Sequence, residues 1–182
     1  MIFQMLSLVL DAVAGLLAGA CLLRLAMQAQ RIPFNQPLGQ FVFAVTDWIV
    51  MPLRKVIPPH TRWDLSSLAA AWVIKLLQFF LLWLLAGAHG QLSWLPMASL
   101  VGLAQLLISA VSALVLVYTL MSWIQPHSPL MHMADRLVKP WLDPVRRMVP
   151  LIAGVDLAPL VLLLLLQLAG MMLAHLQMNG MY

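Results

Sequence analysis

The same group of charged side chains occurs twice in this sequence, at a constant offset of 92 residues. Each group has two adjacent cations followed, ten residues after the first of them, by an aspartate. Adjacent cations can attract anionic lipid headgroups or an acidic partner segment, and each aspartate can pair with the arginine of its own copy. The simpler alternative is that the cations only hold their loops on one side of a membrane. The two groups are Arg54, Lys55 and Asp64, and Arg146, Arg147 and Asp156.

Prolines bracket both basic pairs, in the pattern P-x-R-[KR]-x-x-P. Because proline lacks a backbone N–H, we expect Pro52 and Pro144 to break or kink the preceding helix. Pro58 and Pro150 close the pattern. We expect Asp64 and Asp156, which begin the next apolar segments, to cap free N–H groups there, in favourable contact with the helix dipole.

Four polar residues are candidates for a role inside long apolar runs, where a charged group is costly and needs a partner. Asp11 and Lys75 are the only Asp, Glu, Lys or Arg residues in the apolar runs 2–23, 65–88, 96–124 and 157–178, and antiparallel neighbouring helices would bring both near mid-membrane. They are either a structural pair or part of an ion path. Gln105 and Gln167 are the uncharged candidates, with helix packing as the alternative to a pore lining.

Other catalytic or metal-binding patterns are weak. Met171, His175 and Met178 share a helical face and carry soft ligands for Cu(I), but methionine also fills gaps in apolar cores. The sequence has no glutamate, no phosphate-binding loop and no Ser-His-Asp set. We therefore expect no enzyme activity, no cofactor and no metal.

The composition is that of a membrane protein, with 63% hydrophobic and 9% charged residues. The net charge of +4 is concentrated in two short segments. Nucleic acid is a poor partner for such a chain, since it would require a soluble fold with more charge. Anionic lipid is the better match.

Four apolar runs are long enough to cross a bilayer as helices. We predict spans at about residues 2–27, 65–88, 96–124 and 157–178. All lysines and arginines except Lys75 lie at the end of the first span or in the connections after the first and third spans. The positive-inside rule therefore predicts that the basic loops are cytoplasmic and that both termini lie on the opposite side of the membrane.

The repeated pattern predicts two parallel hairpin units, residues 1–92 and 93–182, because each unit holds an even number of crossings. Between the crossings, apolar residues recur at helical spacing, with tryptophan and cationic flanks. This predicts amphipathic helices in the headgroup plane at about residues 36–51 and 128–143. The fold class is therefore an all-α membrane protein of two helical hairpins, each with an interfacial helix between its crossings.

The segments "LLRLAMQ", "QFVFAVTDWIVMPLRKVIP", "SWIQPHSP" and "PWLDPVRRMVPLIAGVDLAPL" cover much of both units. With them the chain resembles the YggT (YlmG-like) family of small integral membrane proteins, as two tandem repeats. Families of this kind usually read Asn-Pro early in each motif, where this chain has Gln36-Pro37 and Ser128-Pro129.

The resemblance implies a bacterial inner-membrane protein with plastid relatives and without an established catalytic activity. It implies association with membrane-complex biogenesis, division or osmotic homeostasis. We therefore expect a non-enzymatic protein that assists or organises other membrane components, with lipids and unidentified membrane proteins as partners. The alternative is a small oligomeric ion channel or an ion-transport accessory protein. The sequence leaves a homo-oligomer open.

Overall fold

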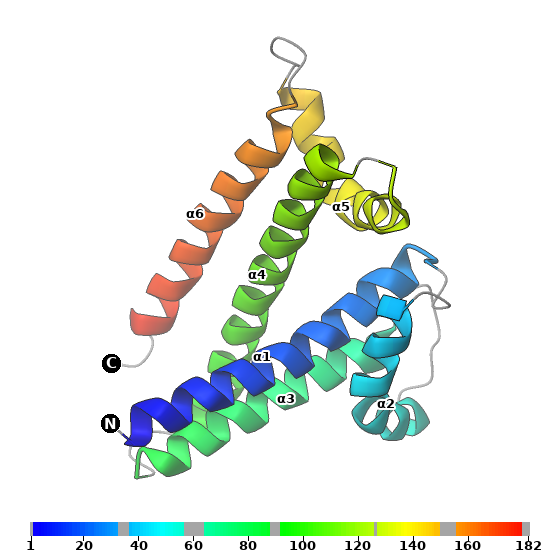
Figure 1. Ribbon diagram of the computed structural model, residues 1–182. Coiled ribbons are helices and arrows are strands. Elements are labelled where there is room, and N and C mark those ends of the chain that lie inside the picture. The colour runs from blue at the N-terminus through cyan, green and yellow to red at the C-terminus, as the bar shows by residue number, and fades with distance from the viewer. Residues whose placement is uncertain are drawn as a thin grey trace. The chain divides into compact units, whose positions relative to one another are not determined.

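A computed structural model describes residues 2–32, 37–56, 64–87, 92–125, 127–149 and 156–179. Within these ranges the chain is entirely helical (Figure 1). The elements are α1 (Ile2–Ala29), α2 (Pro37–Val56), α3 (Leu65–Leu85), the 3-10 turn η1 (Leu92–Trp94), α4 (Leu95–Ile124), α5 (Pro129–Met148) and α6 (Ala158–Asn179). The all-α fold class is confirmed.

Four of these helices are long and apolar enough to cross a membrane. At about 1.5 Å of rise per residue, even the shortest reaches nearly 30 Å, the thickness of the hydrocarbon core. Their positions agree with the predicted spans to within a few residues. The candidate spans are Phe3–Ala29, Leu65–Leu85, Leu92–Ile124 and Ala158–His175.

Local sequence explains several helix ends. Helix α1 ends in a Schellman motif, in which Ile32 N–H donates to the carbonyl of Met27 at 2.9 Å. Arg31 adopts the left-handed conformation that this motif requires, with φ of 53°. Helix α5 begins at Ser128, whose hydroxyl accepts from Met131 N–H at 3.1 Å, with Pro129 in the first turn.

The first compact unit comprises residues 1–107 and 177–182. Helices α1 and α3 lie side by side and antiparallel, and α2 lies at the end where α1 finishes (Figure 1). Small side chains on the facing surfaces allow the helices to approach closely. The buried core of this unit is Ala14, Ala18, Cys21, Leu22, Val50, Ala70, Ala71 and Ile74.

The second compact unit comprises residues 108–176. The later part of α4, helix α5 and the start of α6 share one apolar core. Its buried members are Val111, Val115, Tyr118, Ala134, Val138, Leu142, Val145, Ala158 and Leu162. The cut between the units falls inside α4, whereas the sequence repeat divides at residue 92.

The expected break at Pro52 and Pro144 does not occur, whereas a kink at these prolines stays a prediction. The helices do not end at Pro52 and Pro144; they continue to Val56 and Met148. Each proline removes one hydrogen bond, but packing holds the last turn, since Leu53 packs on the first core and Val145 is buried in the second. Pro58 and Pro150 lie outside the described residues.

The apolar stripe predicted for the second interfacial helix also differs from expectation. Met133, Leu137 and Val145 are buried within the protein, whereas Leu130 and Trp141 are exposed. In α2 the corresponding stripe keeps Phe41 and Trp48 exposed. Helices α2 and α5 therefore differ in which apolar side chains they leave exposed.

Candidate functional site

Arg54 and Asp64 form a buried ion pair between the last turn of α2 and the start of α3. The guanidinium Nη2 lies 2.6 Å from Asp64 Oδ2, and the aspartate has no exposed side-chain surface. The hydroxyl of Ser67 donates to Oδ2 at 2.8 Å, and the hydroxyl of Ser66 donates to Oδ1. Burial raises the pKa of Asp64, but hydrogen bonds from Ser66, Arg54 and Ser67 outweigh it, so the pKa lies below its ordinary value of 3.8.

Arg146 and Asp156 form the corresponding pair in the second unit, at the end of α5 and the start of α6. Arg146 Nε donates to Asp156 Oδ2 at 2.8 Å, and its Nη2 donates to the hydroxyl of Tyr118 at 3.0 Å. About a third of each charged side chain is exposed (37% and 32%). Partial burial lowers the pKa of Arg146, but the bonds to Asp156 and Tyr118 outweigh it, so the pKa lies above its ordinary value.

Both pairs extend to the first helix of their own hairpin. Arg54 Nη2 also reaches Gln28 Oε1 on α1 at 3.4 Å, as Arg146 reaches Tyr118 on α4. In each copy, therefore, one arginine connects a long helix (α1 or α4), the shorter helix that follows it (α2 or α5) and the start of the next long helix (α3 or α6). We call these two groups the arginine–aspartate clusters. Their geometry is that of a structural link between three segments.

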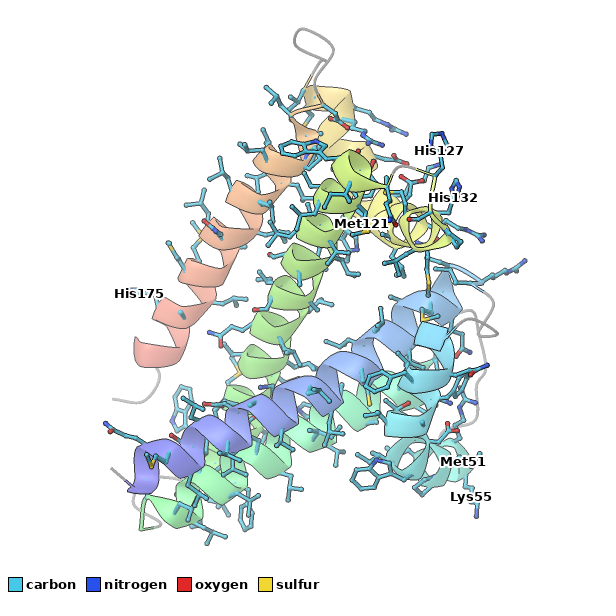
Figure 2. All side chains as sticks on the ribbon, in the orientation of Figure 1. Met51, Lys55, Met121, His127, His132 and His175 are labelled. Atoms are coloured by element: carbon cyan, nitrogen blue, oxygen red, sulfur yellow. The ribbon has the colours of Figure 1, made fainter. Side chains whose placement is uncertain are left out.

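The second cation of each basic pair has a different environment. Lys55 and Arg147 are exposed, and Figure 2 shows Lys55 pointing away from α1 and α3. The basic pairs predicted from sequence therefore separate into an inward cation, neutralised by aspartate, and an outward cation. Among the described residues, Lys55 and Arg147 form no ion pair with an aspartate, so they can meet an external anion.

The expected helix capping occurs in one copy and not in the other. Asp156 Oδ1 accepts from the N–H of Ala158 at 3.0 Å, which caps α6. Asp64 occupies the cap position of α3, but its carboxylate makes no capping hydrogen bond to the backbone. Three side-chain donors, on Arg54, Ser66 and Ser67, take the carboxylate instead. This correction follows from the "DLSS" sequence, which places two hydroxyls beside Asp64.

A further cluster lies at the end of α1 and was not expected from the sequence. Arg24 is 1% exposed, and its Nη1 donates to Thr46 Oγ1 at 2.9 Å and to Asp47 Oδ1 at 2.6 Å. Its guanidinium also stacks over the ring of Phe43, 4.2 Å from the centroid. The sequence signal was an arginine at the end of an apolar run, which the positive-inside rule alone explained.

The intramembrane charges are joined through an amide. Lys75 Nζ donates to Gln78 Oε1 at 2.9 Å, and Gln78 Nε2 donates to Asp11 Oδ1. Lys75 and Gln78 are buried, whereas Asp11 is exposed. Among the described residues, Lys75 and Asp11 therefore form no direct ion pair and are linked through the amide of Gln78.

The two glutamine candidates, Gln105 and Gln167, do not take part in the hydrogen bonds that link Lys75, Gln78 and Asp11. Gln105 is half-buried on α4, and Gln167 is exposed on α6. Within the part of the protein that the structure describes, neither amide forms a side-chain hydrogen bond. One hollow of the first unit, of about 370 Å³, has an apolar lining of Leu6, Leu10, Leu81, Leu84 and Leu85.

Comparison with known proteins supports the repeat. The model of the CCB3/YggT family matches residues 3–85 and again residues 97–177. The uncharacterized protein YggT of Escherichia coli K12 is 34% identical over 181 residues, covering 96% of this chain and 93% of the relative. An uncharacterized protein in the proC 3' region of Vibrio alginolyticus is 34% identical over 156 residues, 84% of either chain. The uncharacterized protein PA0392 of Pseudomonas aeruginosa is 29% identical over 171 residues, covering 92% and 87%. No solved structure matches.

Proposed function

The chain belongs to the CCB3/YggT family, and from this premise we propose that it is a non-enzymatic inner-membrane protein that organises or assists other membrane components. Its relatives are bacterial, and its four apolar helices make it a membrane protein. The family resemblance points to membrane-complex biogenesis, division or osmotic homeostasis as the process it serves.

The observation that carries this proposal is the internal pairing of polar groups inside the membrane spans. Buried Lys75 is bonded to Gln78, and Gln78 to Asp11, so the charges of the first hairpin compensate each other. A residue that moves an ion must exchange its partners with that ion, whereas a structural residue keeps them. The chain of three side chains therefore supports a packing role.

We place the basic ends of the hairpins in the cytoplasm and both termini in the periplasm, as the distribution of cations favours. On that side, exposed Lys55 and Arg147 can contact anionic headgroups, each adding about 1 kcal/mol of attraction. Arg54 and Arg146 are neutralised by aspartate and add less. Exposed Trp48 on α2 lies at a suitable place to anchor in the headgroup layer.

Labelling of single cysteines tests the orientation. Native Cys21 is fully buried, so we expect little labelling of the parent protein by the thiol reagent. Ser93→Cys, on the exposed turn before α4, should react with an impermeant thiol reagent applied from the periplasm, and Lys139→Cys should not. The reverse pattern would overturn the proposed orientation.

Ion flux through purified protein in liposomes tests the function itself. The organising role predicts that proton and potassium leak stays at the level of protein-free vesicles. It also predicts that Lys75→Met alone lowers the amount of protein in the membrane, whereas Lys75→Met combined with Asp11→Asn restores it, because removing both members of a pair leaves no lone charge. Flux above the protein-free level that Lys75→Met abolishes would refute the organising role.

The channel alternative has one specific observation in its favour. Asp11 is exposed within the first membrane span, about 14 Å along α1 from its start, and still connects to buried Lys75 through Gln78. An exposed carboxylate at this depth could accept a cation or proton from outside the hairpin. The flux measurement distinguishes the two roles, and affinity purification in mild detergent with mass spectrometry would identify the organised partners.

A further inference from the structure

Helix α6 carries an exposed stripe that combines aliphatic side chains with one amide. Leu160, Leu164, Gln167 and Met171 are all exposed, and the intervals between them are four, three and four residues. This spacing places the four side chains within about 60° of one another around the helix. We call this set the α6 stripe. Alternating intervals of three and four are the pattern by which one helix packs along another.

Gln167 is the unusual member of the α6 stripe. It lies near the centre of the candidate span Ala158–His175, about 14 Å along the helix from its start. Within the described residues its amide has no hydrogen-bond partner, and lipid tails offer none. At the equivalent position of the first hairpin, 92 residues earlier, the polar residue Lys75 is buried and bonded to Gln78. A polar side chain at this position of the second hairpin also needs a partner.

The chemistry of Gln167 selects the partner. In a symmetric dimer of two copies inserted in the same orientation, the two-fold axis runs along the membrane normal, which places α6 parallel to α6 of the other copy. A residue near that axis faces itself. A lysine or aspartate there would repel its copy, whereas a glutamine amide has both donors and an acceptor and can bond to an identical amide. One polar residue in an apolar seam also fixes the register of two helices.

We infer that the α6 stripe is the contact surface of a symmetric dimer of this protein, in which Gln167 of each copy hydrogen-bonds to Gln167 of the other. The aliphatic members of the stripe pack on either side of the amide pair. No residue of the α6 stripe belongs to the arginine–aspartate clusters or to the hydrogen-bonded set of Lys75, Gln78 and Asp11.

Disulfide formation in native membranes tests the geometry. The Leu164→Cys and Met171→Cys variants of the full-length protein should each give an oxidised dimer. Leu165→Cys and Met172→Cys are matched controls, because these residues are exposed neighbours on the same helix, pointing about 100° away. The controls should give about tenfold less dimer, and the parent, with only buried Cys21, none. Equal yields at all four positions would mean random collision and would overturn the inference, as would an absence of dimer at Leu164→Cys and Met171→Cys.

Energy transfer between labelled copies in vesicles tests the amide pair. Gln167→Leu removes the hydrogen bonds and makes the helix more apolar, so the protein still inserts. Self-association should weaken about tenfold, a size typical of interhelical hydrogen bonds in bilayers. Gln167→Asn keeps a self-complementary amide and should recover much of the loss. Unchanged association of Gln167→Leu would overturn the inference. Loss in both variants would do the same, because it would assign the contact to shape rather than to the amide.

Discussion

Removal of the aspartate from each arginine–aspartate cluster should have unequal effects, although the two clusters are copies of one motif. In the first unit, Asp64→Ala removes the acceptor of one guanidinium and two hydroxyls, and the site is fully buried on the aspartate side. Breaking one partner of a buried pair costs about 3–5 kcal/mol of the free energy of unfolding. Because Arg54 is one-third exposed and can regain some hydration, we expect a cost near the lower end, about 3 kcal/mol.

The Asp156→Ala variant removes a weaker set of interactions. A pair exposed to this degree contributes about 0.2–1 kcal/mol, and the lost cap on Ala158 adds about 0.5–2 kcal/mol. We therefore expect about 1–2 kcal/mol for Asp156→Ala. The difference between the variants should be about 1–2 kcal/mol, or roughly tenfold in the unfolding equilibrium.

Titration of the purified variants with SDS in mixed micelles, followed by circular dichroism, measures these free energies of unfolding. Ser66→Ala is the control for the hydroxyl contribution, because it removes one donor and keeps the ion pair. Equal losses for the two aspartate variants, or a larger loss for Asp156→Ala, would refute the argument from burial.

Three further predictions concern the same scaffold. The pKa of Asp64 is lower in the folded protein than its ordinary value of 3.8, so the carboxylate stabilises the fold above pH 3.8 and this contribution is lost as the pH falls through the folded pKa. SDS titrations at decreasing pH should therefore show a falling free energy of unfolding below pH 3.8. In Asp64→Ala this part of the pH dependence should be absent. Arg24→Lys keeps the charge but removes the planar guanidinium that stacks over Phe43 while its Nη1 donates to Thr46 and Asp47, and should cost about 1–3 kcal/mol in the same assay. No loss would place the pair outside the stable core. Gly102→Val should cost about 1–3 kcal/mol, because a Cβ there would lie 2.7 Å from the Phe79 ring, whereas Gly15→Ala, with open space, is the neutral control.

The sequence was sufficient for the crossing helices because their signal is local. A run of about 20 apolar residues must be helical in a bilayer, and this fixed the position of α3 and α6 to within three residues. The repeat offset also correctly paired Arg54 with Asp64 and Arg146 with Asp156, since each pair is only ten residues apart.

Contacts between distant segments were beyond local reasoning. Arg24 reaches Asp47 across 23 residues, and the intervening turn decides which side chains meet. The contact of Gln78 with Asp11 depends on which face of α3 lies against α1. Because α3 is apolar on all sides, its sequence does not indicate that face. The continuation of α2 beyond Pro52 likewise depended on packing of Leu53, since local propensity alone favours termination there.

The path of α4 has a consequence for the order of assembly during synthesis. Leu103 and Leu106, in the early part of this helix, pack against the core of the first unit, and the hydroxyl of Ser99 accepts from Trp72 Nε1 at 3.0 Å. Ser99, Leu103 and Leu106 belong to the second sequence repeat, whereas Trp72 belongs to the first. The first repeat therefore leaves the ribosome before its own core is complete, and it closes only when the following helix has entered the bilayer. A gene cut between the repeats would yield a first half with part of its core uncovered, so the duplicated halves assemble as one chain.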